Sequence, residues 1–284
     1  MGIMRLLVIG AAGMLGHALL AAARSAGHEA AGLDLPELDI TDVDATAEAV
    51  HAAAPDVVVN CAAWTDVDGA EEHEELAARV NAEGAGNVAA AAAGAGALAV
   101  QISTDYSFDG TATEPYTESS PTSAIGAYGR TKLAGELAVA EAATPEFAIV
   151  RSSWLFGPHG KNFVDTILRA GADRGELKVV HDQVGCPTYT GHLAQALVDI
   201  AERRLTGILH VAGTGWCSWY ELAVAALDGA GIACTVTKTT AAEFGRPAPR
   251  PAYSVLRSER EDVPRLPAWQ EGLAAHLAAS RAAA

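Results

Sequence analysis

The segment RLLVIGAAGMLG, residues 5–16, decides the fold. Residues 5–9 form an apolar run typical of a buried strand, and residues 14–26 are typical of a helix. Gly10, Gly13 and Gly16 lie at the turn between them, where small residues let the backbone approach a pyrophosphate at the helix N-terminus. The spacing is GxxGxxG rather than GxGxxG, so an ordinary strand–helix turn is the alternative. Its place at the start of a strand–helix–strand unit favours a nucleotide site.

Alternating strands and helices continue through the first half of the chain. Further strands are expected at residues 29–33, 56–60, 98–103 and 147–151, and helices at residues 43–54, within residues 71–95 and at residues 128–143. Strands that are apolar throughout and separated by helices are typical of a parallel sheet covered on both faces. We therefore predict an α/β fold with a Rossmann-like doubly wound parallel sheet.

The second half has a looser pattern. Short strands are expected at residues 179–180, 208–211 and 234–237, a stiff loop at Pro247, Pro249 and Pro251, and a final helix near residues 269–279. We predict that residues 1–151 are mainly the dinucleotide-binding domain. Residues 152–284 are predicted to form mainly a smaller C-terminal substrate-binding lobe, interleaved with the end of the main sheet.

Composition excludes several classes of partner. The 284 residues are 50% hydrophobic and carry 35 acidic against 19 basic side chains, a formal net charge of −16. So negative a surface repels nucleic acid and anionic membrane. No stretch approaches the about 20 apolar residues that span a bilayer, and no leader pattern precedes the first strand, so a cytoplasmic location is expected.

The cysteines predict neither a disulfide framework nor a metal site. Cys61, Cys186, Cys217 and Cys234 show no CxxC spacing and no zinc-ligand spacing with histidine. They are interpreted as buried or incidental thiols of a reducing compartment, and no metal is predicted.

A candidate catalytic group follows the strand expected at residues 98–103. Ser103, Thr104 and Asp105 come at its carboxyl end, where open α/β sheets place their active sites. Tyr128 and Lys132 follow at i, i+4 spacing, which puts them on one face of a helix. A neighbouring ammonium lowers the pKa of a phenol, and Thr104 can hydrogen-bond the same carbonyl oxygen. A lone YxxxK is common on exposed helices; its position downstream of both the glycine turn and STD is more specific.

These segments resemble the extended short-chain dehydrogenase/reductases and, within them, the dTDP-4-dehydrorhamnose reductase family. The resemblance covers nearly the whole chain and rests on the segments GAAGMLG (10–16), VVVNCAAWTDVDGAE (57–71), STDYSFDG (103–110), YGRTKLAGE (128–136), RSSWLFGPHGKNF (151–163), DQVGCPT (182–188) and RPAYSVL (250–256). Related sugar-nucleotide dehydratases would have an acidic residue where Tyr106 stands, so dehydration is not expected.

The resemblance implies a role for each catalytic residue. Tyr128 would protonate the C4 carbonyl oxygen of a dTDP-4-keto-6-deoxy sugar as hydride arrives from NADPH or NADH. Lys132 would lower the pKa of Tyr128 and hold the nicotinamide ribose, and Thr104 would polarise the carbonyl. The expected product is dTDP-L-rhamnose, and a homodimer is one expectation for the oligomeric state.

Cofactor contacts are expected along the glycine turn and after the next strands. Asp34 would meet the ribose hydroxyls, although a solvated acid at a strand end is the alternative, and the choice between NADPH and NADH stays open. The expected cofactor-binding residues are Gly10, Ala12, Gly13, Met14, Leu15, Gly16, Asp34, Asp39, Ile40, Ala62, Ala63, Trp64, Thr65, Tyr128 and Lys132.

Substrate contacts are expected from the second half of the chain. Trp154 resembles a substrate-contacting tryptophan, with core packing as the alternative. Arg250 has the guanidinium fork that suits a diphosphate, with an exposed loop arginine as the alternative. The expected substrate-binding residues are Thr104, Asp105, Trp154, Asn162, Gln183 and Arg250. His159 and His181 are interpreted as loop residues.

Two other functions remain open. One is reduction of a different dTDP-4-keto-6-deoxyhexose with the same catalytic residues. The other is a non-catalytic dinucleotide-binding partner, like the regulatory subunit of methionine adenosyltransferase, which resembles the same family. The presence of Thr104, Tyr128 and Lys132 favours catalysis.

Overall fold

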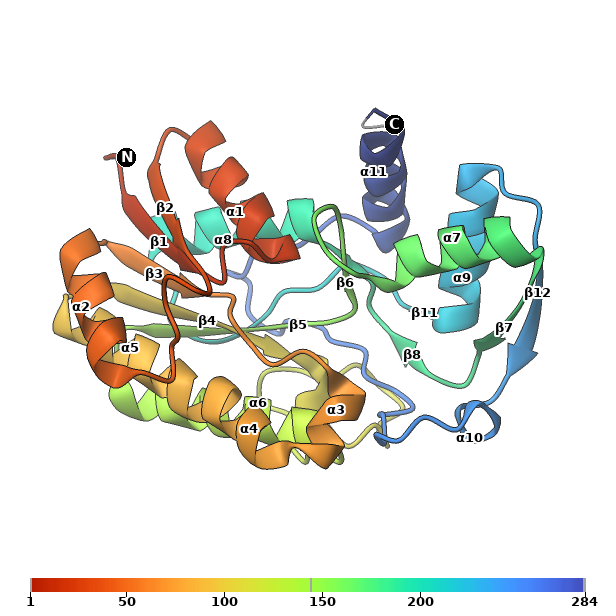
Figure 1. The fold of residues 1–284 in the computed structure, drawn as a ribbon, viewed down its shortest axis with the longest axis horizontal. Helices are drawn as coiled ribbons and strands as arrows, with labels where there is room; N and C mark the ends of the chain where they lie inside the picture. Colours follow the sequence, from red (N-terminus) through yellow and green to blue (C-terminus); the bar gives the residue numbers. More distant parts are fainter. Residues whose placement is uncertain (1, 144, 283–284) are drawn as a thin grey trace.

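A six-stranded parallel sheet forms the centre of the molecule (Figure 1). The computed structural model describes residues 2–143 and 145–282. The strand order is β10-β5-β4-β3-β1-β2, and every neighbouring pair is parallel. The strands are β1 (Arg5–Ile9), β2 (Glu29–Leu33), β3 (Val57–Asn60), β4 (Leu98–Thr104), β5 (Phe147–Ser152) and β10 (Gly207–His210). The predicted doubly wound sheet is confirmed.

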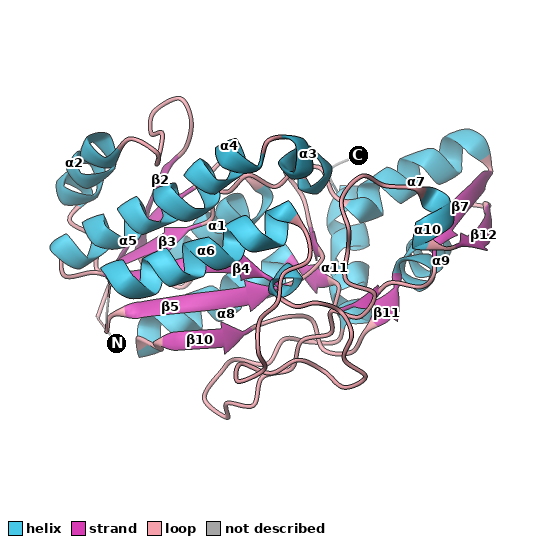
Figure 2. Ribbon diagram, turned by 90° about the horizontal axis from the view of Figure 1, so that it is seen from below, coloured by secondary structure: helices cyan, strands magenta, loops and turns pink. Residues whose placement is uncertain are grey.

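Helices cover both faces of this sheet, as Figure 2 shows. One face packs against α1 (Met14–Ser25) and α8 (Thr190–Arg203), and the other against α2 (Val43–Ala53), α5 (Ala85–Gly94) and α6 (Ala127–Ala142). Along β3, Val57 and Val59 belong to the first core and Val58 to the second, as the alternation of side chains along a strand requires. Both faces of the strand are therefore apolar.

The helix expected within residues 71–95 is broken into several pieces. They are α3 (Val67–Glu72), α4 (Glu74–Ala78), a π-helical segment (Arg79–Gly84) and α5. The π-helical segment contains Asn81, which is buried and bonded to the loop after β3. This tertiary bond, invisible in the local pattern, accompanies the irregular turn.

The second half of the chain builds a smaller layer beside the sheet. It contains α7 (Phe163–Arg174), α9 (Trp219–Ala230), α10 (Ala241–Phe244), α11 (Trp269–Ala282) and the parallel pair β7 (Glu176–Val180) and β12 (Thr235–Thr239). Two short pairs, β6 (Leu155–Phe156) with β9 (Thr188–Tyr189) and β8 (Val184–Gly185) with β11 (Cys217–Ser218), join it to the sheet region. Strands β7 and β12 and helix α11 correspond to predicted elements, whereas the short strands β6, β8, β9 and β11 and the helices α7 to α10 were not predicted.

After β5 the chain leaves the main sheet, and it rejoins the sheet at β10. Strand β10 pairs with β5 at the sheet edge, with His210 opposite Arg151, and α8 packs across α1. The second half therefore contributes both to the main sheet and to the smaller layer. No helix within residues 2–143 and 145–282 has the length and apolar character needed to cross a bilayer.

Candidate active site

The glycine turn after β1 leaves room for a ligand against the backbone. Gly10 has a φ of +80°, and a Cβ added there would lie 2.5 Å from the backbone nitrogen of Ala62. The turn therefore requires glycine at this position. Helix α1 begins at Met14, and its N-cap Gly13 offers no side-chain hydrogen bond to the first amides. These amides remain free for a phosphate, so the residues present fit a dinucleotide.

Asp34 supports this turn from the end of β2. Its Oδ2 accepts a hydrogen bond of 2.8 Å from the backbone N–H of Ala12, and its Oδ1 accepts one of 2.8 Å from Leu35. Asp34 is thus bonded to the turn itself, and its contact with a ribose stays a prediction. Asp39 is exposed, and hydrogen bonds from Thr41 hold the pKa of its carboxyl below the usual value.

Ile40 lies in the core rather than on an open surface. It is buried against Gly84, and its carbonyl oxygen accepts a hydrogen bond of 3.0 Å from Asn87. The Ile40 side chain therefore packs in the core, and a contact of this segment with the cofactor stays a prediction.

The loop after β3 is fixed by a residue that sequence reasoning missed. Asn81 accepts a hydrogen bond of 2.9 Å from the N–H of Trp64 and donates one of 3.2 Å to the carbonyl oxygen of Trp64. It also donates to the hydroxyl of Thr131 on α6 at 3.1 Å. Asn81 therefore ties the expected cofactor loop, residues 62–65, to the helix that carries Tyr128. Its only sequence signal is a polar residue within an alanine-rich helical stretch.

Thr104, Tyr128 and Lys132 come together at the carboxyl end of β4. Gly129 allows this approach, because a Cβ there would clash with the carbonyl oxygen of Tyr106. The buried Lys132 ammonium donates a hydrogen bond of 2.7 Å to the carbonyl oxygen of Ile102 in β4. Burial lowers the pKa of Lys132 to about 8, despite an opposing effect of Glu136.

Tyr128 is kept protonated by its surroundings. Burial and the charge of Asp105 raise the pKa of the phenol to about 12, while a hydrogen bond with Thr104 acts in the opposite direction. The effect of the Lys132 ammonium on this pKa stays a prediction; in this structure the ammonium donates to the carbonyl oxygen of Ile102.

Asp105 is a buried carboxylate at the carboxyl end of β4, and it has no cationic partner in the described residues. Only 2% of its surface is exposed. Its Oδ2 accepts a hydrogen bond of 2.5 Å from the hydroxyl of Ser254, and its Oδ1 accepts one of 3.2 Å from Thr104. Burial raises the pKa of Asp105 to about 7, although both hydroxyls oppose the shift. Ser254 was missed as a site residue, although it lies in the quoted segment RPAYSVL.

A buried ion pair lies beneath this site. Arg151 of β5 donates to both carboxylate oxygens of Glu136, with the shortest contact at 2.6 Å. The hydroxyls of Ser103 and Ser107 also donate to Glu136. This network joins β4, β5 and α6, and so holds the end of β4 and helix α6 in register. Sequence reasoning assigned no role to Glu136 or Arg151.

Two of the expected substrate residues belong to the second half of the chain, which builds the smaller layer. Trp154 has a φ of +47° and stacks on Trp219, with ring centroids 3.4 Å apart and planes 4° apart. The Trp154 Nε1 is buried without a hydrogen-bond partner among the described residues. Gln183 is also buried, and no hydrogen bond of its amide was found within the described ranges. Both therefore keep a polar group free for a ligand.

Asn162 and Arg250 are already engaged in the fold. Asn162 caps α7, accepting from the N–H of Asp165 at 2.9 Å and donating to the carbonyl oxygen of Gly157 at 2.9 Å. Arg250 donates to Asp68 of α3 at 2.9 Å, and Arg246 donates to the same carboxylate at 3.0 Å. A diphosphate at Arg250 would therefore compete with Asp68 or join it.

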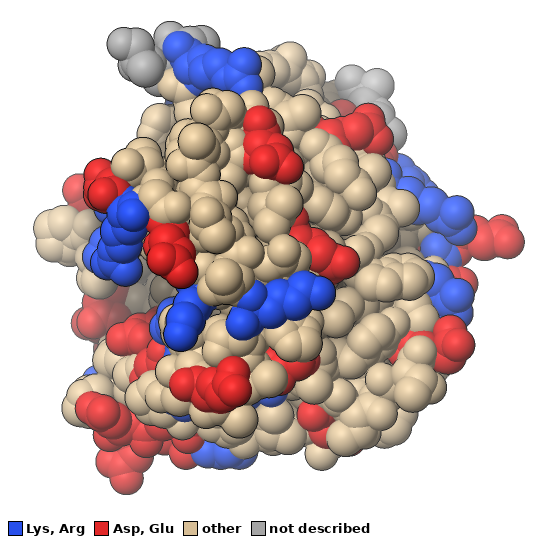
Figure 3. Space-filling view, turned by 90° about the vertical axis from the view of Figure 1, so that its right-hand side faces the viewer, with Lys and Arg blue, Asp and Glu red and all other residues tan. Residues whose placement is uncertain are grey.

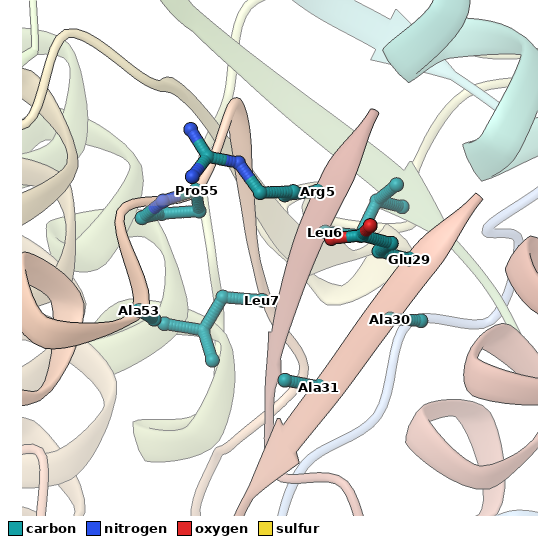
Figure 4. Close-up of a pocket in the computed structure, with 8 residues that line it drawn as sticks. All are labelled: Arg5, Leu6, Leu7, Glu29, Ala30, Ala31, Ala53 and Pro55. Atoms are coloured by element: carbon teal, nitrogen blue, oxygen red, sulfur yellow. The ribbon is translucent and has the colours of Figure 1, made fainter. Parts of the chain in front are cut away.

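The pocket drawn in Figure 4 lies away from the candidate site at the carboxyl ends of the strands. Its volume is about 190 Å³, and it is lined by residues at the amino ends of β1 and β2, among them Arg5 and Glu29. Parallel sheets place their sites at the opposite, carboxyl ends. A wider groove of about 580 Å³ runs between α1 and α8 and includes Met14. In the described ranges, no three His, Cys, Asp or Glu side chains gather as a metal ion would require.

The glycine turn after β1 and the group of Thr104, Tyr128 and Lys132 thus both lie at the carboxyl ends of strands of one parallel sheet. The model of the RmlD substrate binding domain matches residues 4–282. This chain belongs to that family. The resemblance drawn from the seven quoted segments is confirmed.

Members of the RmlD family resemble this chain along its whole length. The dTDP-4-dehydrorhamnose reductase of Mycobacterium tuberculosis H37Rv is 42% identical over 97% of this chain and 93% of its own. A probable dTDP-4,6-dihydroxy-2-methyloxan-3-one 4-ketoreductase of Streptomyces antibioticus is 43% identical over 90% and 88%. The crystal structure of dTDP-4-dehydrorhamnose reductase from Bacillus anthracis, in complex with NADP, superposes with a TM-score of 0.95, at 37% identity and covering 98% and 100%.

The outer face of the smaller layer carries both basic and acidic side chains. Figure 3 shows basic and acidic side chains interspersed on the face that carries α7, α9, β7 and β12. This face has no continuous basic surface of the kind that binds nucleic acid.

Proposed function

We propose that this chain is an NAD(P)H-dependent reductase that converts dTDP-4-dehydro-L-rhamnose to dTDP-L-rhamnose. The observation that carries the proposal is the meeting of Thr104, Tyr128 and Lys132 at the carboxyl end of β4, beside the open glycine turn after β1. Relatives named as dTDP-4-dehydrorhamnose reductases and one NADP complex support the substrate and the cofactor.

The chain's own residues perform the acid step. The bound dinucleotide supplies hydride to C4 of the sugar. Tyr128 holds its proton at neutral pH and gives it to the C4 oxygen, which becomes a hydroxyl. Thr104 hydrogen-bonds the phenol and stabilises the negative charge that develops on it. Lys132 places a cation near Cys61, beside the glycine turn, where a nicotinamide ribose is expected.

The two halves of the chain are proposed to bind different ligands. We propose that residues 1–151 mainly hold the dinucleotide and residues 152–284 mainly the sugar nucleotide. The buried, unpartnered Nε1 of Trp154 supports a sugar site in the second half, to which Gln183 also belongs. Buried polar groups that lack a partner select ligands which supply one.

Reduction of another dTDP-4-keto-6-deoxyhexose is the second candidate. It is favoured by the Streptomyces antibioticus relative, whose name gives a different keto sugar at a similar identity. The acid step would be unchanged, and Trp154 and Gln183 would select the sugar.

The test follows NADPH and NADH oxidation with each of two keto sugars, dTDP-4-dehydro-L-rhamnose and dTDP-4-keto-6-deoxy-D-glucose. Wild type is expected to prefer the first sugar. Tyr128→Phe should lower kcat by about 10²–10⁴-fold while binding the dinucleotide, since it removes only the acid. Dinucleotide binding is measured separately by the fluorescence of the reduced nicotinamide.

Each result has a clear meaning. Preference for the second sugar would replace the rhamnose assignment with the second candidate. Dinucleotide binding without turnover of any sugar, in wild type and variant alike, would contradict a reductase and favour a dinucleotide-binding regulatory partner.

A further inference from the structure

We propose that Asp105 returns a proton to Tyr128 after each reduction, through the hydroxyl of Thr104. This inference rests on the proposed function, because it concerns the step that resets the acid. Asp105 acts here through Thr104, and is therefore a relay residue rather than the group that touches the reacting oxygen.

The contacts form a continuous chain from the acid into the interior. Thr104 is hydrogen-bonded to the Tyr128 phenol, and its Oγ1 lies 3.2 Å from the Oδ1 of Asp105. The second carboxylate oxygen of Asp105 accepts from Ser254. The chain joins three segments distant in sequence, the end of β4, the start of α6 and the loop that precedes α11.

The hydroxyl of Thr104 can make the hydrogen bonds that a proton relay requires. A threonine hydroxyl donates one hydrogen bond and accepts two. Thr104 already accepts from the N–H of Tyr106 at 3.1 Å. Before the reaction Thr104 donates to the Oδ1 of Asp105 at 3.2 Å and keeps one acceptor position for the phenol of Tyr128. Once Tyr128 is a phenolate, the same hydroxyl can turn its proton to Tyr128 and accept the carboxyl proton of Asp105, so three bonds are made in either state. Valine at this position would keep the shape and lose the path.

The surroundings of Asp105 favour its neutral form. Thr104 and Tyr106 face it from its own strand end, Tyr128 from α6, Ser254 from the loop before α11 and Cys186 from the segment before β9. Arg250 interacts with the neighbouring Tyr106 and is bonded to Asp68. Asp105 is thus held by hydroxyls alone, and its pKa of about 7 lets it both keep and release a proton near neutral pH.

The proton balance closes over one turnover. Tyr128 loses its proton to the sugar oxygen and becomes a phenolate. Thr104 gives its hydroxyl proton to the phenolate and takes the carboxyl proton of Asp105. The remaining Asp105 carboxylate is stabilised by Ser254 and regains one proton from water after product leaves. No electrons move in this step.

Lys132 is less suited to this task. Its ammonium donates to the carbonyl oxygen of Ile102, whereas the Thr104 hydroxyl is bonded to both Tyr128 and Asp105.

The first experiment compares one turnover with many. In Asp105→Asn, the ratio of the single-turnover rate constant to kcat should rise by about tenfold or more over wild type, because the first proton is already on Tyr128. Thr104→Val should raise the ratio likewise, whereas Thr104→Ser, which keeps the hydroxyl, should restore the wild-type ratio. An unchanged ratio in both Asp105→Asn and Thr104→Val would overturn the relay.

The second experiment follows the pH dependence of kcat. In wild type, kcat should fall as the pH rises through about 7, where Asp105 loses its proton. Ser254→Ala removes a hydrogen bond that favours the carboxylate, so this alkaline limb should move up by about 1 pH unit. A limb that stays in place while kcat merely drops would indicate a structural role and contradict the relay.

A third measurement needs no substrate, and so separates the relay from the proposed function. The infrared difference between wild type and Asp105→Asn should contain a protonated carboxyl band that disappears between about pH 5 and about pH 9. The band should disappear at higher pH in Ser254→Ala. A carboxyl that is already ionised at about pH 5 would overturn the relay, whichever sugar the enzyme reduces.

Discussion

Two buried carboxylates lie near the end of β4, and they differ in what holds them. Glu136 is bonded to both Nε and Nη2 of Arg151, together with two serine hydroxyls. Among the described residues, the side chain of Asp105 is bonded to the hydroxyls of Thr104 and Ser254 and to no cation. An arginine fixes a carboxylate as a structural charge, whereas hydroxyls can serve either protonation state. Burial alone therefore does not say whether a carboxylate supports the fold or takes part in chemistry.

Removing the charge of Glu136 should have the largest effect on stability. Glu136→Gln leaves the Arg151 guanidinium buried without its anion, which costs about 3–5 kcal/mol of unfolding free energy. Urea denaturation measures this, with Glu141→Gln on the exposed side of the same helix as the control. A loss of less than about 1 kcal/mol, equal to the control, would mean that the ion pair is not what joins β4, β5 and α6.

Removing the charge of Asp105 should increase stability at alkaline pH, the opposite of the effect expected for Glu136. The folded pKa of about 7 lies above the ordinary aspartate value of 3.8, so between those pH values only the folded chain holds the proton. Stability from this group therefore falls as pH rises through the window. Asp105→Asn, which resembles the protonated acid, should be more stable than wild type by on the order of 2 kcal/mol near pH 8 and equal to it near pH 4.

Urea denaturation at several pH values measures this difference, again beside Glu141→Gln. A destabilised Asp105→Asn at every pH would place Asp105 with Glu136 as a structural charge, and the contrast between them would disappear.

A third carboxylate, Asp68, extends the comparison to a partly exposed site and should give the smallest effect. Its bonds to Arg246 and Arg250 lower its pKa from 3.8 to about 2, so its stabilisation is lost as pH falls through that range. Solvent screens these bonds, and Asp68→Asn should cost about 1 kcal/mol at neutral pH and almost nothing near pH 2.

Urea denaturation at both pH values measures this cost, with the exposed Glu72→Gln on the same helix as the control. An equal loss at both pH values would show that Asp68 acts through packing rather than charge.

Local pattern determined the parts of the fold that repeat. The apolar runs at residues 5–9, 56–60 and 98–103 predicted β1, β3 and β4 to within about one residue at each end. The glycine turn, the strand-terminal STD and the YxxxK pair predicted where the site lies, because the carboxyl ends of parallel strands share one edge. Helices α7 to α9 were missed although none contains proline and their apolar residues recur at helical spacing, because the glycine and proline between them led this half to be interpreted as short strands and loops.

The sequence by itself determined the sheet, its edge and the residue types at the site. Only the tertiary structure decided which partner each of them has: Asn81 with the loop after β3, Arg151 with Glu136, and Ser254 with Asp105. The last pair is separated by 149 positions in the sequence. Hydrogen bonds and burial act through space, so the protonation of Asp105 is fixed by neighbours that no local pattern can name.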